Sequence, residues 1–255
     1  MMTSLSINNS HILIMQNPKW TVATVNYNSY DFVQYQLKFF HEFNKDFEFF
    51  VHDNQSETET EESKKIKADY PDVNYIHAIR FGKGWGAHGI ALNNCMKRSK
   101  GKYFLAIDPD FFWMKKEILP FLESYLDSGY HAVGTEYFGH PFPAIWGIAC
   151  ITNEIKDLNL MAKSSFCEKC KEWVYDRDYD TGWQLKIRLG NKPFHAFRQV
   201  ANQVPDFGTY VNKNSQTYVF DEKVIAHHLK SACFKSQNHK ETNEKYINWI
   251  WNNIW

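Results

Sequence analysis

Two carboxylates stand two positions apart where an apolar run of the sequence ends. Residues 104–107 lead into Asp108, Pro109 and Asp110, and three bulky aromatic residues follow. Hard divalent cations such as Mg²⁺ and Mn²⁺ prefer carboxylate oxygens, and their sites commonly combine one or two carboxylates with substrate phosphates. Pro109 lacks a backbone donor and has a fixed φ, so it directs the chain out of a strand. This pattern favours a metal site under a diphosphate, and the alternative is an ordinary surface turn.

Strand and helix patterns alternate before these acids. Strands are expected at residues 20–28, 47–54, 73–79 and 102–107, and helices at 30–43, from 56–65 onward, and from a Gly-rich turn, 82–89, to about 98. Such alternation indicates βαβ units and a parallel sheet, whose ligands bind beyond the carboxyl ends of the strands. Polar or Gly-rich segments follow each strand, so we expect a ligand site at this edge, near Asn26, Asn28, Asp53, the Gly-rich turn with Lys83, and Asp108 with Asp110.

The second half of the chain is less regular. We expect a helix at 119–129, strands at 131–138 and 144–152, a helix-rich stretch through Cys170, a helix at 182–190 and a single late strand at 218–229. The aromatic tail, 244–255, has a pattern compatible with a helix. No internal repeat and no Pro-, Gly- or Ser-rich linker divides the sequence, so we predict a single α/β domain over residues 1–255.

Composition excludes several classes of protein. The 255 residues include 29 basic and 29 acidic side chains, and a net charge of zero disfavours a nucleic-acid-binding protein. Five cysteines are too few and odd in number for a disulfide framework, and we expect the Cys167/Cys170 pair to be reduced thiols in preference to a zinc or redox site. The short apolar piece 11–15 lacks a basic leader and is too short for a membrane span, so we expect a cytoplasmic protein.

The ordered motifs resemble those of family-2-type glycosyltransferases. In that family an Asn begins a helix, a Gly ends it and a strand leads to a D-x-D motif, and these positions match Asn93, Gly101 and Asp108 with Asp110. The first two strands and their polar ends are also similar, so the resemblance covers about residues 20–113. It implies a GT-A fold with a nucleotide-sugar-binding half (20–113), a variable acceptor half (114–235) and a tail (236–255). The implied activity is transfer of a sugar from a nucleotide-sugar, with a UDP-sugar favoured, usually with inversion.

The resemblance also implies roles for individual residues. Asp53 would contact the nucleotide base, Asp110 would bind Mn²⁺ or Mg²⁺, and Asp108 would lie near the ribose or sugar and share the metal. A late histidine would complete the metal site or meet the diphosphate, which points to His227 or His228. Adjacent strand side chains face opposite ways, so only one of the two would enter the site, and we favour His228. Donor-binding residues would then be Asn26, Asn28, Asp53, Lys83, Asn93 and Asp108.

An acidic cluster before the 182–190 helix matches the place where the family carries its general base. The candidates are Asp176, Asp178 and Asp180, although the family's usual E-D-x-D spelling is absent. We favour Asp180, because a helix N-terminus would keep its carboxylate ionised. Asp178 is the second choice, and the alternative for Asp180 is a helix N-cap without a catalytic role.

Two other functions are compatible with the sequence. A sugar-phosphate nucleotidyltransferase would also use paired acids, but it normally carries a basic Gly-rich signature near the first strand, which is absent here. A non-catalytic nucleotide- or glycan-binding module would keep the same strands. For a transferase, the acceptor would be a glycan, a glycolipid or a protein. The tail would either dock on the domain or make a peripheral membrane contact, and the oligomeric state is not specified by the pattern.

Overall fold

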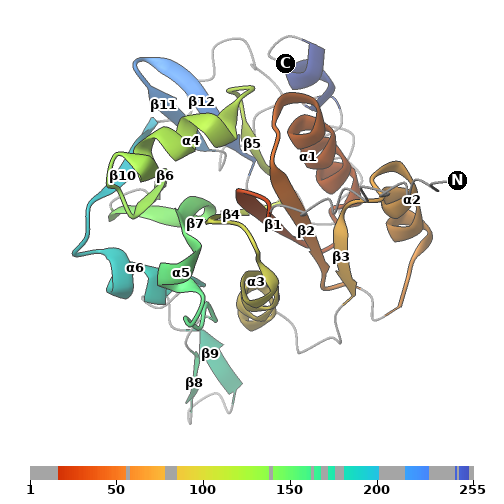
Figure 1. Ribbon diagram of the computed structural model, residues 1–255. Coiled ribbons are helices and arrows are strands. Elements are labelled where there is room, and N and C mark those ends of the chain that lie inside the picture. Colours follow the sequence, from red (N-terminus) through yellow and green to blue (C-terminus); the bar gives the residue numbers. More distant parts are fainter. Residues whose placement is uncertain are drawn as a thin grey trace, which may run out of the picture.

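A ten-stranded sheet forms the centre of the molecule, and helices lie on both of its faces (Figure 1). The computed structural model describes residues 17–55, 58–77, 85–137, 140–161, 164–167, 172–175, 181–200, 216–229, 245 and 247–252.

The first half contains the predicted parallel strands and their connecting helices. The elements are β1 Trp20–Asn26, α1 Tyr30–Phe43, β2 Phe47–Asp53, α2 Glu61–Asp69, β3 Asn74–His77, α3 Trp85–Arg98 and β4 Tyr103–Ile107. β1 pairs in parallel with both β2 and β4, and β2 pairs in parallel with β3. The predicted α/β fold class is confirmed, with strand ends within a few residues of those expected from the sequence.

The second half adds antiparallel strands to the same sheet. Its elements are β5 Phe111–Trp113, α4 Ile118–Asp127, β6 Ala132–Tyr137, β7 His140–Ile151, α5 Thr152–Ile155, β8 Ser164–Cys167, β9 Glu172–Tyr175, α6 Trp183–Leu189, β10 Phe194–Val200, β11 Gln216–Phe220 and β12 Lys223–His228. The order across the sheet is β3-β2-β1-β4-β7-β6-β10-β11-β12-β5, and β8 and β9 form a separate pair.

Two expectations for this half were wrong. The stretch through Cys170 is not helix-rich, because only the short α5 precedes the antiparallel pair β8 and β9. The late strand at 218–229 is a hairpin, because Asp221 and Glu222 both take a left-handed backbone, with φ of 48° and 62°. A turn of this kind usually carries Gly or Asn, so its sequence gave no turn signal. Strands β5 and β10 were not anticipated.

Each face of the sheet has its own apolar cluster. Side chains of α1, α2 and α4 pack with one set of strand residues, and side chains of α3, α5 and α6 pack with the other set. β4 illustrates the alternation: Leu105 and Ile107 face the first cluster, and Phe104 and Ala106 face the second. Because both faces are covered, central strands read as continuous apolar runs.

Gly101 permits a close approach of two chain segments just before β4. A Cβ atom at this position would lie 2.5 Å from the backbone nitrogen of Thr21, inside any allowed contact distance. The amide of Gly101 also donates to Thr21 Oγ1 at 3.0 Å. The turn from α3 into β4, and so the position of the acids after β4, therefore depends on a residue without a side chain.

The aromatic tail docks on the domain. Residues 247–252 are helical, and Figure 1 shows this segment, in dark blue, near α1. Ile247 and Ile250 are buried in a third apolar cluster with Phe32, Phe112 and Leu229, which come from α1, β5 and the end of β12. Lys38 Nζ lies 3.4 Å from the ring centroid of Trp251. In the described part of the chain, every helix is too short or too polar to cross a membrane.

We predict that Ile250→Ala lowers the free energy of unfolding by about 2–5 kcal/mol, the usual cost of truncating a buried isoleucine. Ile250 is 0% exposed. Asn252→Ala, on the exposed side of the same helix, is the matched control and is expected to stay within about 0.5 kcal/mol of the parent. Urea denaturation followed by circular dichroism measures both variants. Equal stabilities would show that the tail does not pack as described.

Candidate active site

The acids at the end of β4 lie in a tight turn held by α1 and β7. The amide of Phe111 donates to the Asp108 carbonyl at 3.1 Å, and the Asp108 amide donates to the Trp146 carbonyl at 3.1 Å. Gln36 on α1 is buried, and its Nε2 donates to the carbonyls of Asp108 and Phe111 at 2.6 and 3.1 Å. These bonds hold the turn, and both carboxylates come close to His228.

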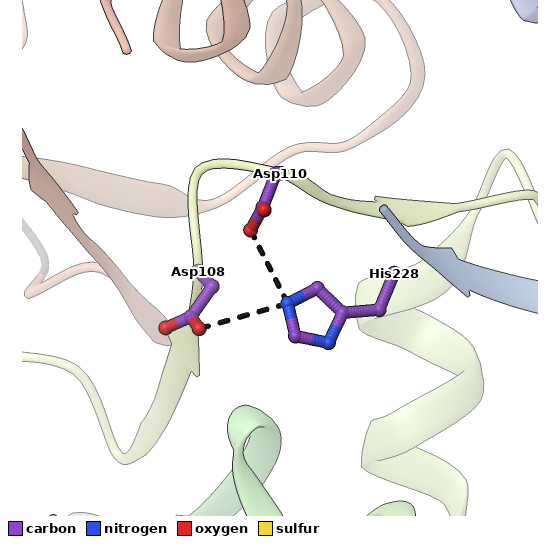
Figure 2. A group of neighbouring side chains, drawn as sticks. All are labelled: Asp108, Asp110 and His228. Atoms are coloured by element: carbon purple, nitrogen blue, oxygen red, sulfur yellow. Dashed lines mark hydrogen bonds and ion pairs between the residues drawn. The ribbon is translucent and has the colours of Figure 1, made fainter. Parts of the chain in front are cut away.

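His228 reaches the acids because β12 pairs antiparallel with β5. The register places His228 opposite Phe111, and the amide of Leu229 donates to the Asp110 carbonyl at 3.0 Å. Figure 2 shows the result: His228 Nε2 lies 3.2 Å from Asp110 Oδ1 and 3.7 Å from Asp108 Oδ2. One ligand atom from each residue lies within 4.8 Å of the other two. Two carboxylates and an imidazole so arranged fit a divalent cation.

His227, the other half of the predicted pair, does not join this group. Its Nδ1 lies 3.0 Å from Thr217 Oγ1, as expected for the opposite face of the strand. Burial, together with the nearby His228, lowers the pKa of His227 to about 3. The ring of His227 is therefore a neutral, packed side chain, and His228 is the one that faces the acids.

Three residues around the metal group were not assigned there from the sequence. His88 Nε2, from α3, lies 3.4 Å from Asp108 Oδ1. Trp146 stacks on the His228 ring, with centroids 5.3 Å apart and an interplanar angle of 28°. Gln216 Oε1 lies 3.1 Å from His228 Nδ1. For these three residues, the only signal in the sequence was that His88 belongs to the predicted Gly-rich turn, 82–89. The structure places residues 85–89 of that segment in α3.

Asp53 lies at the end of β2 and is enclosed by protein donors. Its side chain is 0% exposed. Oδ2 accepts from the hydroxyls of Tyr30 and Tyr75 at 2.7 and 2.8 Å, and Oδ1 accepts from the amide of Gln55 at 2.9 Å. Burial and the adjacent carboxylate raise the pKa of Tyr30 to about 12 and also raise the pKa of Tyr75. The tyrosines therefore stay protonated, and the expected base contact of Asp53 stays a prediction.

Asn26 and Asn28 shape the turn after β1. Asn26 is buried, and its Oδ1 accepts from the amide of Ser29 at 3.0 Å. Asn28 takes a left-handed backbone, with φ of 54°, and its amide donates to Gln55 Oε1 at 2.9 Å. This turn therefore lies next to the loop that follows Asp53, which puts both at the same edge of the sheet.

Asn93 lies inside α3, although the resemblance placed it at a helix start. α3 begins at Trp85, and Asn93 connects the helix to the second half of the chain. Its Nδ2 donates to Asn159 Oδ1 at 2.8 Å, and its Oδ1 accepts from the amide of Leu160 at 2.8 Å. The structure therefore gives Asn93 a role in joining the two halves.

Lys83, Asp176, Asp178 and Asp180 lie outside the described residues. The segment that follows the acidic cluster is described: Gly182, with φ of 82°, is the N-cap of α6, and its amide donates to the carbonyl of Leu160 at 2.8 Å. The N-cap position is thus two residues beyond Asp180. Because Leu160 is bonded to Asn93, the start of α6 is tied to α3.

A comparison with protein families gives a match. The sequence pattern of "Glycosyl transferase family 2" matches residues 21–178, which is more than half of the chain. No curated protein matches the sequence.

Among solved structures, Staphylococcus aureus TarS 1–349 in complex with UDP-GlcNAc is 15% identical, with a TM-score of 0.50, over 92% of this chain and 67% of that chain. The mannosyltransferase PcManGT from Pyrobaculum calidifontis in complex with GDP-Man and Mn²⁺ is 17% identical, with a TM-score of 0.49, over 71% of this chain. The match spans only 55% of PcManGT. The TarS match, at this identity, shows a shared fold alone.

We predict that His52 makes folding stability depend on pH. His52 on β2 is 1% exposed. Its Nδ1 lies 3.0 Å from Asn54 Oδ1, and its Nε2 accepts a hydrogen bond from Asn94 Nδ2 at 3.1 Å. Burial lowers its pKa to about 4. Unfolded histidine titrates near 6.5, so below that pH the unfolded chain binds a proton that the folded chain does not. Stability contributed by neutral His52 is therefore present above pH 6.5 and lost as pH falls toward 4.

The measurement is the free energy of unfolding at pH 7 and pH 5, for the parent and for His52→Gln. The parent is expected to lose about 2 kcal/mol more than the variant over this interval. The comparison removes the contribution of other histidines, which titrate in both proteins. An identical pH dependence would contradict the buried, neutral state of His52.

Proposed function

Because this chain belongs to glycosyltransferase family 2, we propose that it moves a sugar from a nucleotide-diphosphate sugar to an acceptor hydroxyl, in a hexosyltransferase-type reaction. The observation that carries the proposal is the convergence of Asp108, Asp110 and His228 at the carboxyl end of β4. In α/β sheets this edge is where ligands bind. The same edge holds the end of β2 at Asp53 and the turn of Asn26 and Asn28, so a donor nucleotide bound at this edge would lie beside the metal group.

Asp108, Asp110 and His228 would hold the divalent cation. A bound cation would stabilise the negative charge that develops on the departing nucleotide diphosphate. The imidazole favours Mn²⁺ over Mg²⁺, because Mg²⁺ takes oxygen ligands almost entirely while transition metals also accept nitrogen. Asp108, whose side chain is 23% exposed, is the acid better placed to meet the donor as well, and His88 Nε2 lies 3.4 Å from its Oδ1.

The acceptor hydroxyl needs a base as it attacks the anomeric carbon. We assign this role to Asp180, with Asp178 as the second choice, because both come just before α6 and the start of α6 is bonded to the segment that Asn93 fixes. A base on the acceptor side would support in-line attack opposite the leaving diphosphate, which inverts the anomeric configuration. A UDP-sugar is the first donor to test.

We predict that Asp110→Asn weakens Mn²⁺ binding by at least about 100-fold and abolishes sugar transfer, because the amide removes a charged ligand. Isothermal titration with Mn²⁺, followed by UDP-, GDP- and dTDP-sugars, measures both steps. Asp69→Asn, an exposed acid at the end of α2, is the matched control and should bind as the parent does. If the parent binds neither Mn²⁺ nor any of these donors, the proposed function fails.

We further predict that Asp180→Asn lowers kcat by about 10²–10⁴-fold and leaves the donor dissociation constant unchanged, as expected when only a general base is lost. Asp178→Asn is the parallel variant and should retain most of kcat. The reverse ranking would move the base to Asp178. Full kcat in both variants would exclude the acidic cluster from proton transfer.

A further inference from the structure

His228 is held on the side of its ring that faces away from the acids. Its Nδ1 lies 3.1 Å from Gln216 Oε1, across the β11–β12 ladder that pairs these two residues. His228 and Gln216 are each 4% exposed, so both are shielded from bulk water. Whether Nδ1 carries a proton therefore depends on whether Gln216 accepts or donates the hydrogen bond between them.

A chain of hydrogen bonds behind Gln216 supports the orientation of its amide group. Trp146 Nε1 is only a donor, so at 3.0 Å it requires the Tyr218 hydroxyl oxygen to accept. Tyr218 then directs its one proton to Gln216 Oε1, also 3.0 Å away. Burial raises the pKa of Tyr218, so this proton is retained. Gln216 Nε2 donates to Gln199 Oε1 at 3.1 Å, which holds the amide in the same orientation.

The amide oxygen of Gln216 is therefore what faces His228, and an oxygen can only accept. Nδ1 therefore carries a proton. Asp110 Oδ1, 3.2 Å from Nε2, is also an acceptor, so Nε2 can donate to Asp110 in the free protein, and a bound cation would take the place of that proton. Trp146 contributes in two ways. Its Nε1 begins the hydrogen-bond chain that leads to His228, and its ring stacks on the His228 ring.

We propose that Gln216, supported by Tyr218 and Trp146, is a positioning residue that sets the Nδ1–H tautomer of His228 and aims Nε2 at the metal position. The inference rests on the proposed function, because a bound metal ion is the ligand that would need the Nε2 lone pair of His228. The hydrogen bond itself exists in the free protein and can be tested there. Outer hydrogen bonds of this kind typically change metal affinity by about 10–100-fold when they are removed.

The test uses Gln216→Leu, which keeps the approximate volume and removes the acceptor, and Gln216→Glu, which keeps an acceptor oxygen. Thr217→Val is the matched control, because Thr217 holds His227 on the opposite face of the same strands. Tyr218→Phe keeps the ring and removes only the hydroxyl, so it takes the place of Gln216→Leu if that variant does not fold. ¹⁵N–¹H spectra of the imidazoles at pH 8 report the tautomer, and titration with Mn²⁺ alone reports affinity.

In the parent and in Thr217→Val, Nδ1 of His228 is expected to carry a proton. In Gln216→Leu the proton is expected on Nε2, with Mn²⁺ binding weakened by about 10–100-fold, and Gln216→Glu is expected to restore both properties. A Nδ1 proton and parent-like Mn²⁺ affinity in Gln216→Leu would overturn the inference. Absence of Mn²⁺ binding in the parent would instead count against the proposed function, and the spectra would still decide the role of Gln216.

Discussion

The candidate site depends on the pairing of a three-residue strand, β5, with β12. This pairing places His228 opposite Phe111 and joins Leu229 to the Asp110 carbonyl, although residues 110 and 228 are far apart in the chain. Three residues form few ladder bonds, so packing must hold β5. Phe111 and Trp113 are buried in the cluster under α1 and α4, and Phe112 is buried in the cluster that the tail completes. The aromatic residues after the D-x-D motif thus fix the ligand that comes from the far end of the sequence.

Bringing two carboxylates together in a partly enclosed site opposes folding, because like charges repel and lose hydration. Asp110 is only 8% exposed, and the Asp108 side chain is 23% exposed. Hydrogen bonds to Gln36, Trp146 and Leu229 hold the backbone around the acids and so keep the turn in place against this repulsion. His228 and a bound cation would offset the remaining charge, and a cation that binds only the folded chain would raise its stability.

The sequence was sufficient for the parts of the molecule whose signals are local. The first four strands, their helices and the acids after β4 follow from apolar periodicity and from the rule that ligands meet the carboxyl ends of parallel strands. The parts that the sequence did not reveal depend on distant pairing. Gln216 and Trp146 reach His228 only through the order β7-β6-β10-β11-β12, and the hairpin at Asp221 and Glu222 has no glycine to signal it. Asn93 was placed at a helix start because motif spacing does not report where a helix begins.

A bulge in the β11–β12 ladder decides which of the two histidines meets Gln216. Val219 pairs with Val224, but the next pair is Tyr218 with Ala226, so Ile225 is an extra residue on β12. If the ladder had no bulge and the register of Val219 with Val224 continued, His227 would lie opposite Gln216, and His228 would lie one position further along the ladder. With the bulge, His228 faces Gln216 and His227 faces Thr217, as the hydrogen bonds of both rings show. One inserted residue therefore exchanges the faces of the two histidines relative to β11, because side chains along a strand alternate between faces. The sequence His-His does not show which histidine faces the acids, and the register of the sheet determines it.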